Sequence, residues 1–344
     1  MANLLELDDL NEDTLLANIE KRYYDSDVKI YTWIGSSILV ALNPYQKVPI
    51  YTVDKAKECR NFVKGFQSGV VDESARPEPH LFMVAEEAYQ DLVIDKQSQS
   101  IIVTGESDAG KTEATKVILS YLARWKDNFS SNDSGSTDLF DRKNYLGTDT
   151  SLEKQVLDSN PLLEAFGNAK TVKNDNSSRF GKFIQVNVER SGKIISATIR
   201  SYLLEKSRIV HQNSNERNFH IFYYVFIDPA ISEMHGLKDP ADYTYLENSF
   251  IDAIPEEEDQ MGCKIMKNCM KKLGFSNDEY NEIIDLVVGI LSLGNIRFDE
   301  QYVNGKGDES YVDTDTEQYL EKVTKLFGSQ YKDFIEKVNM SDNF

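Results

Sequence analysis

Cysteine, histidine and positive charge are scarce in this chain of 344 residues, and each shortage excludes a class of protein. The three cysteines form no C-x-x-C pair, which excludes a fold built on disulfides and fits a reducing compartment. The four histidines are scattered, a pattern that argues against a zinc site or a nucleophilic triad. Only 38 Lys and Arg stand against 57 Asp and Glu, and the net charge of -19 repels nucleic acid and anionic lipid.

Long hydrophobic runs are also missing. The longest, Ile221–Ile227 and Leu286–Leu293, are far shorter than the ~20 residues that cross a bilayer. The N-terminus has neither the basic region nor the long apolar region of a signal peptide. Hydrophobic residues still make up 40% of the chain, enough for a substantial core in one large domain or two ordinary ones. We therefore expect a soluble, cytoplasmic protein without a membrane span.

The spacing of apolar residues predicts a mixture of strands and helices. Apolar runs predict buried strands over 38–42 and 100–104, and alternation predicts an antiparallel hairpin with strands over 184–188 and 195–199. Apolar residues at helical spacing predict helices over the ranges 13–24, 83–92, 112–125, 218–227, 281–293 and 316–327. Strands mixed with long helices indicate the α/β class, with a sheet that is not purely parallel.

The strongest motif lies between the predicted strand 100–104 and the predicted helix 112–125. The phosphate-loop (P-loop) pattern G-x-x-x-x-G-K-[ST] is matched by Gly105, Glu106, Ser107, Asp108, Ala109, Gly110, Lys111 and Thr112. Its glycines let backbone N–H groups curl around phosphate oxygens, its lysine faces the outer phosphates, and its last hydroxyl ligates Mg²⁺. An ordinary strand-to-helix turn with a glycine cap and a solvated lysine is the alternative interpretation.

Two further clusters of residues are informative when a P-loop is also present. Asn174–Lys182 is dense in Asn and Ser, which by itself is typical of a loop with local side-chain-to-backbone hydrogen bonds. Next to a P-loop, its hydroxyls and Arg179 suggest a segment that senses the γ-phosphate and the metal. Asn43–Tyr51, by itself, is a turn bracketed by prolines.

Together, and in this order, the three clusters resemble the nucleotide pocket of the myosin motor head. The P-loop is similar to the family's G-E-S-G-A-G-K-T, Asn174–Lys182 to its switch I, N-x-N-S-S-R-F-G-K, and Asn43–Tyr51 to its purine-binding loop. The resemblance runs from about residue 5 to 340 and includes the longer stretches Asn160–Lys170, Tyr202–Arg208 and Glu216–Tyr223.

The resemblance implies a P-loop NTPase-like mixed central sheet flanked by helices, the myosin motor core, here incomplete. It implies ATP as the bound nucleotide, with adenine flanked by Asn43, Pro44 and Tyr51. Residues 105–112 would wrap the phosphates, with Lys111 as an electrostatic clamp.

The same resemblance assigns the metal and the catalytic residues. Thr112 and Ser178 would hold Mg²⁺, and Asn174 and Ser177 would lie at the γ-phosphate, with Ser177 near the attacking water. Arg179 would pair with a glutamate of the family's switch II.

The resemblance also divides the chain. It implies a purine-loop and P-loop region over 1–125, a variable surface loop over 126–151, switch I with a transducer-like hairpin over 152–210, and a helical upper actin-cleft region over 211–344. The stretch 127–138, rich in Ser, Asn and Asp, fits the surface loop.

Two departures from the family pattern affect the expected activity. Asp108 stands where the family has glycine, and a carboxylate ~5 Å from a phosphate oxygen costs about 3 kcal/mol, roughly a hundredfold in affinity. That cost falls toward zero if the side chain points away, so we expect weakened ATP binding that Asp108→Gly partly restores. Switch II, D-x-x-G-F-E, is not found, since the similar stretch Asp285–Gly289 continues as a helix, and Arg179 lacks that family partner.

Two functions are compatible with these residues, and a third is not. The leading hypothesis is the ATP-binding part of an actin-based motor, an ATPase of the actin cytoskeleton whose partner is the actin filament, with light chains or calmodulin only in a full-length protein. A degenerate head that binds nucleotide or partners without hydrolysis is the alternative. An unrelated P-loop kinase or transporter ATPase would need a hydrophobic strand ending in an aspartate, and we find none.

Overall fold

The computed structural model describes residues 1–25, 29–106, 108–124, 155, 156, 158–189, 192, 194–247, 254–303 and 306–328. The chain divides into two compact units. The first unit comprises Met1–Leu157 and Ile184–Ile199, and the second comprises Asp158–Phe183 and Arg200–Phe344. Residues 126–151, expected to form a variable surface loop, lie outside the described residues.

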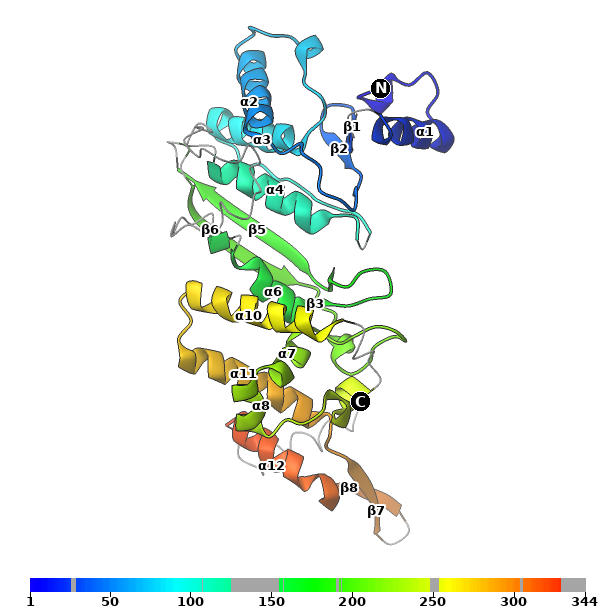
Figure 1. Ribbon diagram of the computed structural model, residues 1–344, viewed down its shortest axis with the longest axis vertical. Coiled ribbons are helices and arrows are strands. Elements are labelled where there is room, and N and C mark those ends of the chain that lie inside the picture. The colour runs from blue at the N-terminus through cyan, green and yellow to red at the C-terminus, as the bar shows by residue number, and fades with distance from the viewer. Residues whose placement is uncertain are drawn as a thin grey trace. The chain divides into compact units, whose positions relative to one another are not determined.

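The described part of the first unit contains four long helices and the small hairpin of β1 and β2 (Figure 1). The helices are α1 (Glu12–Tyr23), α2 (Val53–Gln67), α3 (Leu81–Asp95) and α4 (Lys111–Arg124). The strands β1 (Tyr31–Ile34) and β2 (Ile38–Ala41) pair antiparallel. Three of the helices begin at residues whose side chains accept a backbone N–H, namely Asn11, Thr52 and His80.

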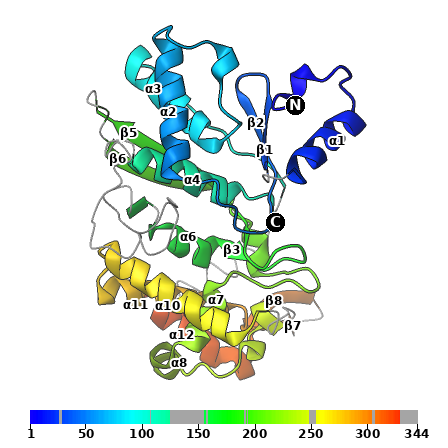
Figure 2. The same ribbon diagram turned by 45° about the horizontal axis from the view of Figure 1, so that its top comes forward.

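The core of the first unit forms where α3 contacts both α2 and α4, an arrangement visible in both ribbon views (Figures 1 and 2). Phe82 of α3 and Tyr121 of α4 are fully buried and their rings are in contact. The buried carboxylate of Glu86 also reaches this contact, where it accepts a hydrogen bond of 2.8 Å from the Tyr121 hydroxyl. Burial of these large side chains stabilises the packing of α3 against α4, the helix in which the predicted P-loop ends.

The second unit is mostly helical. Its helices are α6 (Asn160–Gly167), α7 (Ile221–Ile227), α8 (Pro229–His235), α9 (Thr244–Glu247), α10 (Glu256–Lys272), α11 (Asn277–Leu293) and α12 (Glu317–Leu326). Its short strands β3 (Asn168–Ala169) and β4 (Ser177–Ser178) pair antiparallel, as do β7 (Phe298–Val303) and β8 (Lys306–Val312). The strands β5 (Gly181–Val188) and β6 (Ile194–Tyr202) form a further two-stranded sheet. Its residues between 184 and 199 are assigned to the first unit and its remaining residues to the second.

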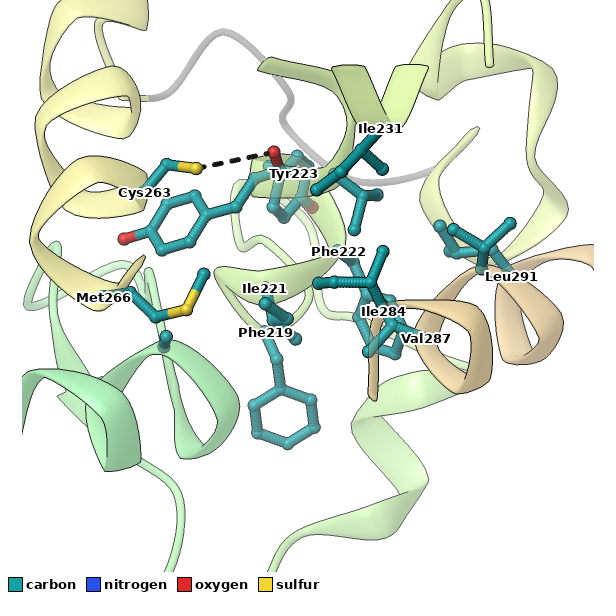
Figure 3. Packing of buried hydrophobic residues seen from close by; sticks show 14 of the residues in the cluster. Phe219, Ile221, Phe222, Tyr223, Ile231, Cys263, Met266, Ile284, Val287 and Leu291 are labelled. Atoms are coloured by element: carbon teal, nitrogen blue, oxygen red, sulfur yellow. Dashed lines mark hydrogen bonds between the residues drawn. The ribbon is translucent and has the colours of Figure 1, made fainter. Parts of the chain in front are cut away.

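The central element of the second unit is the short helix α7, which contacts α10 and α11. Figure 3 shows the aromatic and aliphatic side chains of α7 between Cys263 and Met266 of α10 and Ile284, Val287 and Leu291 of α11. A helix that is apolar on all faces is expected to be buried in this way. The uninterrupted run Ile221–Ile227 is therefore a core helix.

Most predicted elements are confirmed. The predicted helices correspond to α1, α3, α4, α7, α11 and α12, and the predicted hairpin to β5 and β6. One expectation of burial was wrong: β2 forms, but Ile38 is 58% exposed. Leu16, an apolar residue of α1, is also 66% exposed. In α1 the buried side chains are instead Asn18 and Arg22.

The predicted mixture of helices and strands is confirmed, but the predicted buried strand over 100–104 was wrong. These residues carry no strand assignment, and Ile102 is 86% exposed. The described part of the chain forms four separate two-stranded sheets, and none of them includes this segment. A buried strand needs hydrogen-bonded neighbours on both sides, which 100–104 does not have among the described residues.

The first unit should lose stability in acid because of His80. Burial lowers the pKa of this imidazole to about 3, and its Nδ1 accepts a hydrogen bond from the Phe82 amide. The unfolded chain takes up a proton below about pH 6.5 and the folded chain does not, so stability falls as pH decreases from about 6.5 toward 3.

His80→Asn keeps a side-chain acceptor at the start of α3. We expect this variant to reduce the pH dependence of the free energy of unfolding by about 1.4 kcal/mol per pH unit. Denaturant unfolding at several pH values measures the slope. Equal slopes for the wild-type and variant chains between pH 4 and 6 would contradict the assignment.

Candidate phosphate loop and switch segment

The loop from Gly105 to Gly110 has left-handed φ values at three of its described positions. They are +152° at Gly105, +70° at Asp108 and +85° at Gly110. Glycine adopts such values without a steric penalty, and aspartate tolerates them better than most residues. A Cβ on Gly105 would approach the Cβ of Ala109 to 3.1 Å, so a larger residue at this position would also be tightly packed. Ser107 lies outside the described residues.

Lys111 is the first residue of α4, and its ammonium is folded over the loop. The Nζ atom donates hydrogen bonds to the carbonyl oxygens of Gly105 and Glu106 at 2.8 and 2.6 Å. A positive charge is therefore placed at the N-terminus of a helix of 14 residues, where backbone N–H groups already favour anions. Thr112, the next residue, is half-buried.

Asn43, the first residue of the segment 43–51, contacts this loop. The side-chain amide of Asn43 donates a hydrogen bond of 2.8 Å to the carbonyl oxygen of Asp108. Pro44 follows and is half-buried. Tyr51, the other residue of the predicted adenine site, has its hydroxyl 2.8 Å from that of Tyr31 and its ring against His80. The structure thus brings Asn43 to the loop and places Tyr51 in an aromatic cluster of the first unit.

The predicted switch segment lies in the second unit, where β4 holds its centre. Ser177 is buried and pairs with Ala169 of β3, whereas Ser178 is exposed and its hydroxyl donates to the carbonyl oxygen of Phe180 at 3.3 Å. The side-chain oxygen of Asn174 accepts the amide of Asn176 at 2.8 Å, which closes a turn. Asn174, Ser177 and Ser178 are therefore presented by one ordered segment.

Arg179 has a carboxylate partner, although the switch II glutamate of the resembling family is not in the sequence. Its Nε donates to Glu205 at 2.6 Å, and Arg208 donates to the same oxygen at 2.9 Å. Burial raises the pKa of Glu205, but the hydrogen bonds from the two arginines outweigh this and leave the pKa below its ordinary value. Glu205 is thus a charged anchor for the end of the switch segment.

We expect Glu205→Ala to loosen the switch segment without unfolding the second unit. Glu205 is partly exposed, so loss of its two ion pairs should cost only about 1 kcal/mol. Amide hydrogen exchange over 177–180 should therefore be about fivefold faster, with Glu233→Ala in α8 as a control. Unchanged exchange in the Glu205 variant would contradict the anchoring role.

Two residues of this region could not be predicted from the sequence. Glu205 lies in the stretch Tyr202–Arg208, which carries a resemblance to the family, but no local pattern indicates its contact with Arg179. Tyr45 belongs to a segment that local patterns indicate only as a turn, yet interaction with the side chain of Asp108 raises the pKa of its hydroxyl. Both contacts join residues far apart in the chain.

The described residues hold neither a cluster of metal ligands nor a helix that could cross a membrane. No group of three or more His, Cys, Asp or Glu side chains gathers there in a way that would hold a metal ion. The hydroxyls of Thr112 and Ser178 are hard oxygen donors of the kind that Mg²⁺ takes alongside phosphate oxygens and water. No described helix has the length and apolar character needed to cross a membrane.

These features define a chain of mixed helices and strands with a glycine-containing loop and a lysine at the start of a helix. More specifically, the chain belongs to the myosin head (motor domain) family, whose model matches residues 1–342.

Similar proteins include Myosin-1 of Saccharomyces cerevisiae, 45% identical over 86% of this chain and 15% of its own length. Myosin-I heavy chain of Dictyostelium discoideum is 40% identical over 86% of this chain and 11% of its own length. Unconventional myosin-Ib of Homo sapiens is 36% identical over 95% of this chain and 26% of its own length. The chain therefore spans only about a tenth to a quarter of these relatives.

Proposed function

We propose that this chain binds Mg·ATP as the nucleotide-binding part of an actin-based motor. Backbone N–H groups of residues 105–112 would bind the phosphates, and the ammonium of Lys111 would neutralise their charge. The observation that carries this proposal is the position of Lys111, at the start of α4 and 2.6–2.8 Å from two carbonyls of the loop. Adenine would lie beside Asn43, Pro44 and Tyr51.

The metal would be held by the hydroxyls of Thr112 and Ser178. Bound Mg²⁺ neutralises charge on the phosphate oxygens during transfer of the γ-phosphoryl group. The exposed hydroxyl of Ser178 and the half-buried Thr112 support these roles.

Hydrolysis would proceed by in-line attack of water on the γ-phosphorus. Asn174 and Ser177 would orient the water and the phosphate, so that catalysis comes from positioning and from stabilisation of developing charge. Arg179 would hold the switch segment in place, a role supported by its ion pair with Glu205.

The remaining proposals follow from membership of the family. In a full-length protein, hydrolysis would drive movement along the actin filament, and light chains or calmodulin would bind outside this chain. The protein would act in the cytoplasm, on the actin cytoskeleton. The fold would include a P-loop NTPase-like mixed central sheet flanked by helices.

Titration with a fluorescent ATP analogue tests the proposal. We expect saturable binding that weakens when EDTA removes Mg²⁺, and displacement of the analogue by unlabelled ATP. A single-turnover experiment with the same chain then measures hydrolysis separately from binding. Absence of saturable binding in the presence of Mg²⁺ would contradict the proposed function.

A further inference from the structure

The side-chain amide of Asn43 bridges two backbone segments that are far apart in the sequence. Its nitrogen donates a hydrogen bond of 2.8 Å to the carbonyl oxygen of Asp108, 65 residues further along the chain. Its oxygen accepts a hydrogen bond of 3.1 Å from the backbone amide of Tyr45. One end of the side chain therefore closes the turn that begins at Asn43, and the other end holds the backbone of the P-loop.

The backbone is left-handed at both ends of this bridge. The φ angle is +49° at Tyr45 and +70° at Asp108, values that residues other than glycine seldom adopt. Such conformations persist only when surrounding contacts hold them, and Asn43 supplies one hydrogen bond at each residue. A Cβ on Gly110 would also lie 3.8 Å from the Asn43 side chain, so this side chain packs beside the last glycine of the loop.

The carbonyl that Asn43 holds belongs to the peptide group between Asp108 and Ala109. In a trans peptide the C=O and the N–H lie in one plane and point in opposite directions, so fixing the Asp108 oxygen also fixes the direction of the Ala109 N–H. That N–H donates to the Glu106 carbonyl at 3.3 Å, a bond longer than the usual range. A phosphate oxygen is a stronger acceptor than a carbonyl and would compete well for this N–H.

We propose that Asn43 is a positioning residue for the phosphates, because its side chain orients the Asp108–Ala109 peptide so that the Ala109 N–H can be presented to a phosphate oxygen. This inference rests on the proposed nucleotide binding and names the part of the nucleotide whose binding depends on Asn43. The dependence runs through the backbone of the P-loop and does not require the base. A phosphate chain without adenine should therefore lose as much affinity as ATP does when Asn43 is changed.

Two ligands separate the phosphates from the base. The affinities of a fluorescent ATP analogue and of inorganic tripolyphosphate, which displaces it, are measured with Mg²⁺ for the wild-type chain, Asn43→Ala and Asn43→Ser. Serine keeps an acceptor for the Tyr45 amide but is too short to reach the Asp108 carbonyl. We expect both variants to bind both ligands about fivefold more weakly, which corresponds to about 1 kcal/mol, the net contribution of one neutral hydrogen bond.

The control is Asn61→Ala, which removes an exposed asparagine side chain from α2 and should leave both affinities unchanged. A loss of affinity for the ATP analogue but not for tripolyphosphate would overturn this inference and leave nucleotide binding intact, since Asn43 would then recognise the base. Wild-type affinities in Asn43→Ser would also overturn it, because the bond to Asp108 would then contribute nothing. Absence of binding by the wild-type chain would overturn the proposed function and this inference together.

Discussion

Lys111→Ala is expected to weaken ATP binding by about a hundredfold. The ammonium lies 2.8 and 2.6 Å from the carbonyls of Gly105 and Glu106, and we expect it to turn from these oxygens to the phosphates when nucleotide binds. Hydrogen bonds to charged groups contribute about 1.5–3 kcal/mol, and here one ammonium faces several phosphate charges. Isothermal titration calorimetry or a fluorescent analogue measures the change in dissociation constant.

A matched control lies further along the same helix. Lys116 pairs with Glu113 on the surface of α4, and Lys116→Ala should leave the affinity within about twofold of wild type. Equal losses for the two variants would indicate a general electrostatic effect of the acidic chain. An unchanged affinity for Lys111→Ala would reject the role of the loop in phosphate binding.

Arg217→Ala is expected to destabilise the second unit by about 3–5 kcal/mol, because the change leaves the buried Asp259 charge without this partner. Arg217 is 1% exposed, and its two terminal nitrogens donate to the Asp259 carboxylate at 2.6 and 3.2 Å. Its guanidinium also lies over the Tyr223 ring, 3.7 Å from the centroid. Thermal unfolding, the measurement that checks this, should shift by about 10 °C.

Two further variants show whether the cost comes from the unpaired charge. Replacing both partners, with Arg217→Met and Asp259→Leu together, should recover much of the lost stability because neither charge of the pair then remains buried. Lys272→Ala, which removes a loose surface pair with Asp158, should cost under about 1 kcal/mol. A double variant as unstable as the single one would contradict this explanation.

Helical periodicity and loop chemistry were readable from the sequence. The helices α3, α4, α11 and α12 follow regular apolar spacing, and α7 is an uninterrupted apolar run. The glycines at 105 and 110 do adopt left-handed φ values. The pairing of β7 with β8 was not predicted, because Phe298–Val312 is rich in acidic and glycine residues and lacks a clear apolar alternation.

Contacts between distant residues could not be predicted from one sequence. Glu205 lies 26 residues from Arg179, and Asp108 lies 65 residues from Asn43. Local patterns carry no information about such pairs, since they depend on how elements pack. The buried strand expected over 100–104 fails for the same reason: its apolar run has the composition of a central strand, but strand formation requires partners elsewhere in the chain.

The most direct test of the central claim is a crystal structure of the chain with Mg²⁺ and a non-hydrolysable ATP analogue. We predict phosphate oxygens about 2.7–3.2 Å from backbone nitrogens of residues 105–112. We also predict that Lys111 Nζ moves from the carbonyls of Gly105 and Glu106 to a phosphate oxygen. An analogue bound elsewhere, or Lys111 still bonded to the two carbonyls beside a bound analogue, would contradict the claim that this loop binds ATP.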